Sequence, residues 1–130
     1  MLPFTVFVIE DNRTESMLLR LALSELPNLE ITTFLHATAM LKEIDKKPTI
    51  AIIDLNLPDM NGLTLIEKIK ENSPNTRMVV VSAQRDMDIL AKAQEAGVYN
   101  YLVKSENCLA YLGKVIEELL IVIEHKNSLQ

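Results

Sequence analysis

Three short, continuous runs of apolar, largely β-branched residues restrict the folds open to this chain more than any other feature. They cover residues 6–9, 50–53 and 78–81. Because polar residues do not alternate with apolar ones inside them, these runs are typical of strands buried on both faces of a parallel sheet. Weaker strand patterns cover residues 29–34 and 99–103. All five segments are therefore interpreted as strands.

Segments in which apolar residues recur at helical spacing lie between these strands. They cover residues 13–26, 37–44, 63–72 and 87–96, and a last helix begins near residue 108. Prolines at 27, 48 and 74 separate a helix from the next strand, and Gly97 suits a helix C-cap. The alternation predicts an α/β fold, a doubly wound, five-stranded parallel sheet with helices on both faces.

The composition excludes several classes of protein. The chain has 130 residues and a formal net charge of −5, without a cluster of Lys and Arg, which argues against direct nucleic-acid binding by this domain. Its longest apolar run, 119–123, is far shorter than a membrane span, and its N-terminus lacks the basic region of a signal peptide. A single cysteine, Cys108, excludes an internal disulfide framework and is interpreted as a small buried residue. We therefore expect one cytoplasmic domain over residues 1–130, with no membrane partner.

Chemically active side chains stand where the predicted strands end. Glu10 and Asp11 follow the first strand, Asp54 the third, Ser82 ends the fourth and Lys104 follows the fifth. The carboxyl ends of parallel strands lie at one edge of the sheet, where α/β proteins bind ligands. Three carboxylates at one edge repel one another unless a cation joins them. A hard divalent ion with oxygen ligands, most simply Mg²⁺, is the expected cofactor.

The same set of residues suits the transfer of a phosphoryl group to a carboxylate. That reaction needs a nucleophile in line, a metal on the phosphoryl oxygens and fixed positive charge. Asp54 stands centrally and is the best candidate for a nucleophile that becomes an aspartyl-phosphate. Lys104 would pair with Asp54 or with the phosphoryl group, and the Ser82 hydroxyl would donate to a phosphoryl oxygen.

Four motifs then resemble those of the receiver domain of two-component response regulators. They are VIEDN at 8–12, IDLNLPDMNG at 53–62, VVSA at 80–83 and AGVYNYLVK at 96–104. The resemblance extends from about Phe4 to about Glu124. It implies a flavodoxin-like sheet of strand order 2-1-3-4-5 and a bacterial signalling switch. It also implies that the phosphoryl group comes from a phosphohistidine of a sensor kinase or phosphotransfer protein, and that a downstream effector protein or domain reads the result.

The resemblance assigns the metal site to four residues. Asp11 would bind Mg²⁺ directly, Glu10 directly or through water, and Asp54 as the phosphoacceptor itself. The backbone carbonyl of Asn56 would be a further ligand.

The resemblance also assigns a switch. Ser82 would follow the phosphoryl group when it arrives, Tyr101 would be the aromatic side chain that turns inward as Ser82 moves, and Lys104 would contact the phosphoryl group. Asn56 and Gln84 occupy positions that tune the rate of hydrolysis. Glu106 and the faces around Tyr101 would form the output surface.

One position departs from the family pattern. Ser105 follows Lys104, where the family usually has a proline joined by a cis peptide bond. A cis bond to a residue other than proline costs about 2.5–4 kcal/mol, so we expect a trans bond here.

The last helix is unusually apolar. Its residues at 3-4-3-4 spacing form a heptad seam of Leu109, Leu112, Ile116, Leu119 and Ile123. Two explanations stay open. The helix either packs deeply within the domain, or it presents a second apolar face to a homodimer partner or to a linker that follows it.

Several functions compete. We expect a signalling switch that catalyses only its own phosphorylation and dephosphorylation, and hence not an enzyme acting on other substrates. One alternative is a degenerate receiver that binds partners without phosphate, and another is an aspartate-nucleophile phosphatase of the haloacid dehalogenase type. That phosphatase would place its nucleophile after the first strand and carry a cap. A flavin-binding protein is disfavoured, because Glu10 and Asp11 would repel a phosphate.

Two possibilities stay open for the protein as a whole. The chain either acts alone or is the front part of a longer regulator.

Overall fold

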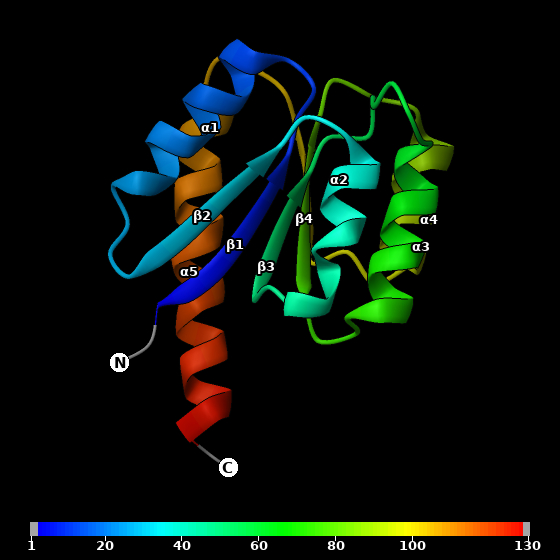
Figure 1. The fold of residues 1–130 in the computed structure, drawn as a ribbon. Helices are drawn as coiled ribbons and strands as arrows, with labels where there is room; N and C mark the ends of the chain where they lie inside the picture. The colour runs from blue at the N-terminus through cyan, green and yellow to red at the C-terminus, as the bar shows by residue number, and fades with distance from the viewer. Residues whose placement is uncertain (1–2, 129–130) are drawn as a thin grey trace.

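The computed structural model describes residues 3–128 and consists of a parallel sheet between two layers of helices (Figure 1). The strands lie in the order β2-β1-β3-β4-β5, so the predicted fold class and strand order are confirmed. The strands are β1 (Phe4–Ile9), β2 (Leu29–Phe34), β3 (Ile50–Ile53), β4 (Arg77–Ser82) and β5 (Asn100–Val103). The helices are α1 (Arg13–Ser24), α2 (Ala37–Lys42), α3 (Gly62–Asn72), α4 (Met87–Glu95) and α5 (Cys108–Ser128), and a short 3-10 helix, η1 (Ile44–Lys46), follows α2.

Two helices end two residues earlier than their sequence patterns predict. The first stops at Ser24 rather than at residue 26, because Leu26 precedes Pro27, and a residue before proline avoids the helical region. The second stops at Lys42, and its predicted last turn is replaced by the 3-10 helix. Lys47 then takes a left-handed conformation (φ 52°), which turns the chain into β3.

Each face of the sheet has its own hydrophobic core. Phe7 and Ile9 of β1 point to the core that is covered by α2, α3 and α4, whereas Val6 and Val8 point to the core that is covered by α1 and α5. Figure 1 shows these two helical layers on opposite sides of the strands. Because successive residues of a strand face opposite sides, a fully apolar strand is what a doubly covered sheet requires.

The heptad seam of α5 belongs to the second core. Leu112, Ile116 and Leu119 are fully buried, Ile123 is nearly so, and the half-buried Leu109 packs against the same cluster. For these residues the structure therefore shows deep packing within the domain. A homodimer through the last helix stays a prediction, and it would have to use other residues, such as the exposed Ile121 and Val122. Cys108 is buried, as predicted.

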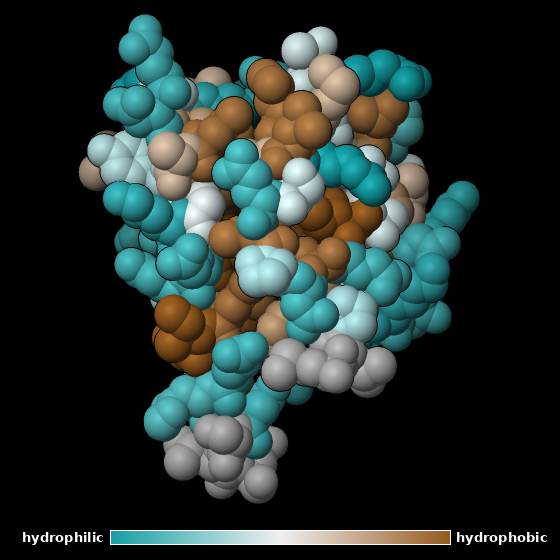
Figure 2. Space-filling model, turned by 90° about the vertical axis from the view of Figure 1, so that its left-hand side faces the viewer, coloured by the Kyte–Doolittle hydropathy of each residue, from teal (hydrophilic) through white to brown (hydrophobic). Residues whose placement is uncertain are grey.

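One side of the molecule carries much exposed apolar surface. Figure 2 shows hydrophobic residues gathered across the side that carries α1 and the edge strand β2. On α1 the exposed large hydrophobic side chains are Met17, Leu18 and Leu21. Within residues 3–128, none of the helices is both long enough and apolar enough to cross a membrane.

Candidate functional site

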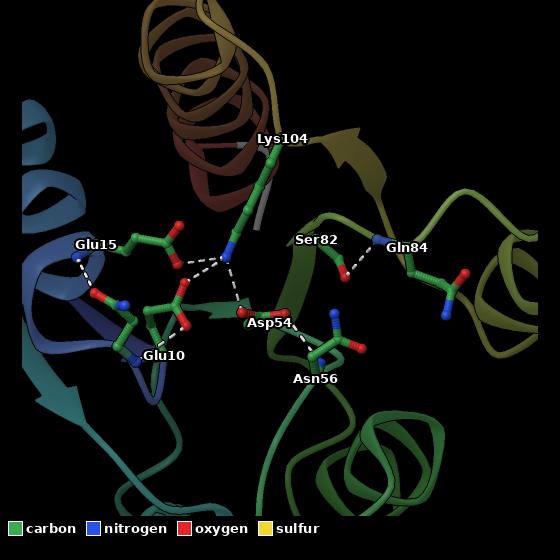
Figure 3. Close-up of polar contacts among 8 residues, drawn as sticks. Glu10, Glu15, Asp54, Asn56, Ser82, Gln84 and Lys104 are labelled. Carbon is green, nitrogen blue, oxygen red and sulfur yellow. Dashed lines mark hydrogen bonds and ion pairs between the residues drawn. The ribbon is translucent and has the colours of Figure 1, made fainter.

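The ends of three strands meet around the side chain of Lys104. Its Nζ lies 2.6 Å from Glu10 Oε1 and 3.0 Å from Asp54 Oδ2. Figure 3 shows Lys104 reaching down between these two acids, with Ser82 on the far side of Asp54. Glu10, Asp54 and Lys104 therefore converge at one edge of the sheet, as predicted, and Lys104 pairs with Asp54, one of the two partners predicted for it.

A third acid in this cluster is Glu15, which the sequence analysis did not select. Its Oε2 lies 2.7 Å from Lys104 Nζ. Glu15 reaches the site because only residues 10–12 separate the end of β1 from the start of α1. Asn12 is the N-cap residue of α1, and its Oδ1 accepts a hydrogen bond from the Glu15 N–H at 3.0 Å. Side chains in a helix lean toward its N-terminus, so Glu15 in the first turn leans toward the end of the sheet.

Asp11 lies outside the cluster. Within residues 3–128, the only group of three or more His, Cys, Asp or Glu side chains whose ligand atoms lie within 4.8 Å of one another consists of Glu10, Glu15 and Asp54. Asp11 is the second residue after β1 and is exposed. Its role as a direct metal ligand stays a prediction.

Burial and crowding of charge dominate the electrostatics of the cluster. Glu10 and Asp54 are buried, and burial together with a hydrogen bond to Asp54 raises the pKa of Glu10 to about 8. Burial by itself would lower the pKa of Lys104, but its bonds to Glu10, Glu15 and Asp54 raise that pKa above the ordinary value. The bond to Lys104 lowers the pKa of Glu15. Lys104 is therefore a fixed positive charge, and the metal-free cluster retains a proton near neutral pH.

Ser82, Gln84 and Tyr101 form a second set of contacts beside Asp54. Ser82 is buried, and its Oγ accepts a hydrogen bond from the Gln84 N–H at 3.2 Å. The Tyr101 hydroxyl donates to the backbone carbonyl of Gln84 at 2.9 Å. The Gln84 Oε1 accepts from the N–H groups of Arg85 and Asp86, each at 3.1 Å, so this side chain points toward the start of α4. Burial raises the pKa of Tyr101, whose hydroxyl is therefore protonated over the ordinary pH range.

The loop that follows Asp54 is fixed at both ends. The Asn56 N–H donates to Asp54 Oδ1 at 3.0 Å, and a β-bridge joins Asn56 to Asn61. The Asn61 Oδ1 then accepts from the Leu63 N–H at 2.8 Å as the N-cap of α3. Asn56 therefore lies beside Asp54, and the role of its backbone carbonyl as a metal ligand stays a prediction.

Asp59 ties the middle of this loop to another helix. Its carboxylate accepts hydrogen bonds from the N–H groups of Ala37 and Thr38, both at 3.0 Å, and from the Thr38 hydroxyl at 2.9 Å. His36 is the N-cap residue of α2 but its side chain makes no capping bond. Asp59 therefore caps α2 from a distant part of the chain, and these bonds lower the pKa of Asp59.

The donor set suits a divalent cation that prefers oxygen. Carboxylate oxygens of Glu10, Glu15 and Asp54 already lie within 4.8 Å of one another. Two oxygens on opposite sides of Mg²⁺ are about 4.2 Å apart, because each Mg–O distance is about 2.1 Å. Small side-chain movements would therefore bring two of these groups onto one ion.

The peptide bond after Lys104 is trans, as predicted for Ser105, because no cis peptide bond occurs within the described residues 3–128. The Lys104 backbone N–H donates to the Ser82 carbonyl at 2.9 Å, which continues the β4–β5 pairing up to the site. The position of Lys104 is thus set by the sheet itself.

Comparison with known proteins points to one family. A family model described as the response regulator receiver domain matches residues 6–113. The chain is 35% identical over 117 residues to the DNA-binding transcriptional regulator NtrC of Azospirillum brasilense, covering 89% of this chain and 24% of that protein. It is 33% identical over 103 residues to the transcriptional regulatory protein KdpE of Staphylococcus aureus, covering 78% of this chain and 44% of that protein.

Solved structures agree on the fold. The BeF3-activated DrrB receiver domain superposes with a TM-score of 0.82 at 23% identity, over 92% of this chain and 98% of that one. A CheY-like response regulator receiver domain protein from Methanospirillum hungatei gives a TM-score of 0.83 at 22% identity, over 95% of this chain and 98% of that one. This chain spans about a quarter of the length of the NtrC proteins that it matches.

Proposed function

The chain belongs to the response regulator receiver domain family, and on that premise we propose that it is a phosphoaccepting switch with Asp54 as the acceptor. The observation that carries the proposal is the buried Asp54 carboxylate held 3.0 Å from the Lys104 ammonium. A degenerate receiver would have no use for a complete set of acids, hydroxyl and lysine at this edge.

The proposed reaction transfers a phosphoryl group from a phosphohistidine of a sensor kinase or phosphotransfer protein. An Asp54 carboxylate oxygen attacks phosphorus as the P–N bond breaks, and the departing imidazole nitrogen keeps the electron pair and takes a proton. Hydrolysis reverses the switch. Water attacks phosphorus, the bond to the Asp54 oxygen breaks, and inorganic phosphate leaves with the carboxylate restored. The chain would catalyse only these steps on itself.

The surrounding residues would stabilise the transferred group. Lys104 supplies a positive charge to a phosphoryl oxygen, and the Ser82 hydroxyl can donate to another. A bound Mg²⁺, held by Glu10, Asp11, Asp54 and the Asn56 carbonyl, would neutralise the charge that develops on the phosphoryl oxygens. The contact between the Ser82 hydroxyl and a phosphoryl oxygen exists only when Asp54 is phosphorylated. Phosphorylation therefore favours movement of Ser82 toward Asp54.

Tyr101 would transmit the movement of Ser82 to the surface of the domain. Its hydroxyl is bonded to the carbonyl of Gln84, two residues after Ser82, so displacement of Ser82 pulls on the same short loop. That loop leads into α4, and Tyr101 itself lies on β5. We propose that a downstream effector protein or domain reads this face, including Glu106.

The apolar patch on α1 supports a protein phosphodonor. Met17, Leu18 and Leu21 are exposed on the helix whose first turn carries Glu15, close to the acid cluster. An exposed apolar patch of this kind commonly marks a protein interaction site. A partner that packs on α1 would thereby bring its phosphohistidine to the adjoining edge of the sheet.

The test is labelling with radioactive acetyl phosphate, in the presence and absence of Mg²⁺. Wild-type protein is expected to be labelled only with Mg²⁺, and Asp54→Asn is expected to remain unlabelled. The exposed Asp45→Asn is the matched control, because it makes the same chemical change outside the site. Undiminished labelling of Asp54→Asn would overturn the proposal. Steady release of phosphate from a phosphomonoester would instead support the phosphatase alternative.

A further inference from the structure

The ammonium group of Lys104 has no free donor. A lysine ammonium offers three N–H bonds, and here it has three carboxylate partners, at 2.6 Å to Glu10, 2.7 Å to Glu15 and 3.0 Å to Asp54. In the proposed function Lys104 must donate to a phosphoryl oxygen. At least one of these acids must therefore release Lys104 before that contact forms.

Exposure distinguishes the three acids. The side chains of Glu10 and Asp54 are only 1% and 5% exposed, whereas that of Glu15 is 45% exposed. A carboxylate that leaves a salt bridge must be solvated by water or by another donor, because an unpaired buried charge is costly. Asp54 itself carries the phosphoryl group. Glu15 is thus the acid that can leave Lys104 at the lowest cost.

A second partner is already in place for Glu15. It stands three residues after the N-cap residue Asn12, at the position where a glutamate usually reaches back to the N–H of the cap residue. Here that N–H instead has Glu10 Oε2 at 3.4 Å, a long hydrogen bond, while Glu15 is bonded to Lys104. The usual capping arrangement is therefore incomplete in this structure, and Glu15 can complete it by a change of side-chain rotamer.

We propose, building on the proposed function, that Glu15 is a positioning residue that holds Lys104 in the unphosphorylated protein and competes with the phosphoryl group for it. When Asp54 is phosphorylated, Glu15 moves to water or to the Asn12 N–H, and Lys104 turns to the phosphoryl oxygen. The contact thus lowers the occupancy of the phosphorylated state. Glu15 makes and breaks only hydrogen bonds and ion pairs, and no covalent bond.

The test measures the affinity for beryllofluoride, an analogue of the phosphoryl group, at saturating Mg²⁺. Glu15→Gln is expected to bind about two- to fivefold more tightly than wild type, since a partly exposed ion pair is lost only from the unbound state. Glu25→Gln removes the same charge at the other end of α1 and is expected to match wild type. Equal or weaker binding by Glu15→Gln would overturn the role of Glu15.

A double-variant cycle separates this role from simple charge repulsion. In a Lys104→Met background the effect of Glu15→Gln is expected to vanish, because the competition needs the lysine. Repulsion between Glu15 and the analogue would persist in that background, and its persistence would refute the competition. If wild-type protein bound no beryllofluoride and took no label from acetyl phosphate, the proposed function itself would fail. If wild type bound and Glu15→Gln bound no tighter, only the role of Glu15 would fail.

Discussion

The hydroxyl of Tyr101 on β5 donates a hydrogen bond to the backbone carbonyl of Gln84, 2.9 Å away, in the loop that follows β4. This bond joins two β–α units at the edge of the sheet that carries the acids. It also holds the aromatic ring against the loop that follows Ser82. The ring and the candidate phosphoryl-binding hydroxyl are therefore linked through one short segment of backbone.

Removing this bond should weaken the fold measurably. Tyr101→Phe keeps the ring but leaves the Gln84 carbonyl without that donor, so the free energy of unfolding is expected to fall by about 0.5–1.5 kcal/mol. Urea unfolding followed by circular dichroism measures the difference. Tyr111→Phe is the control, because Tyr111 is 56% exposed on α5, and its effect is expected to stay within about 0.5 kcal/mol. Equal effects of the two substitutions would contradict a stabilising role for the Tyr101 hydroxyl.

Asp59 should stabilise the protein in a pH-dependent way. Asp59→Asn leaves one acceptor oxygen for three donors, so at pH 7 the free energy of unfolding is expected to fall by about 0.5–1 kcal/mol, the lower range for a lost cap at an exposed site. The bonds lower the pKa of Asp59 in the folded protein. Its contribution is therefore present above the unfolded pKa of about 4 and is lost as the pH falls through the folded value.

Urea unfolding of wild type and Asp59→Asn at pH 7 and at pH 3 tests the direction of this pH dependence. The difference in the free energy of unfolding between the two proteins should be larger at pH 7. Asp45→Asn, at an exposed position of the 3-10 helix, provides the comparison for removal of a charge alone. A difference that grows on acidification would show that the carboxylate of Asp59 is not the stabilising form.

The strands and the three convergent residues could be predicted because they depend on local patterns. A fully apolar run identifies a doubly covered strand, and the rule that parallel strands end at one edge brings Glu10, Asp54 and Lys104 together. The contacts of Tyr101 and Asp59 could not be predicted in this way. Each depends on how two loops from different β–α units lie against each other, and sequence periodicity carries no information about that.

Glu15 and the heptad seam of α5 show two further limits of prediction from the sequence. Glu15 lies on a helix rather than at the end of a strand, so a search of strand ends passes over it. The spacing of Asn12 and Glu15 signals a helix start, but not that the acid turns to Lys104 instead. For α5, residues at 3-4 spacing pack equally well against a sheet or against a second helix. Only the buried state of Leu112, Ile116 and Leu119 shows that the sheet is their partner here.

Glu10 should make the metal-free protein less stable as the pH rises. Burial raises its pKa from 4.5 to about 8, so between these values the folded state holds a proton that the unfolded state has released. Its favourable contribution is complete below pH 4.5 and is lost as the pH rises through about 8. With EDTA present, the free energy of unfolding of wild type relative to Glu10→Gln should therefore decline from pH 5 to pH 8.5. A constant difference over that range would show that the folded and unfolded pKa values of Glu10 are equal.

Gly62 should be intolerant of any side chain, whereas Gly113 should accept one. A Cβ atom on Gly62 would lie 2.5 Å from the Leu55 Cα, a contact with backbone that no rotamer can relieve. Gly62 begins α3, and Leu55 directly follows Asp54, so relief requires the start of α3 to move away from the phosphoacceptor loop. Gly62→Ala is therefore expected to lower the free energy of unfolding by about 1–3 kcal/mol, the usual cost of overpacking, and to slow labelling by acetyl phosphate. Gly113 lies within α5, and among residues 3–128 no atom outside its own helical turn comes within 4 Å of a Cβ built on it, so Gly113→Ala should stabilise the protein by about 0.5–1 kcal/mol. Urea unfolding of both variants provides the measurement, and a Gly62→Ala protein as stable as wild type would refute the close packing of α3 on the loop.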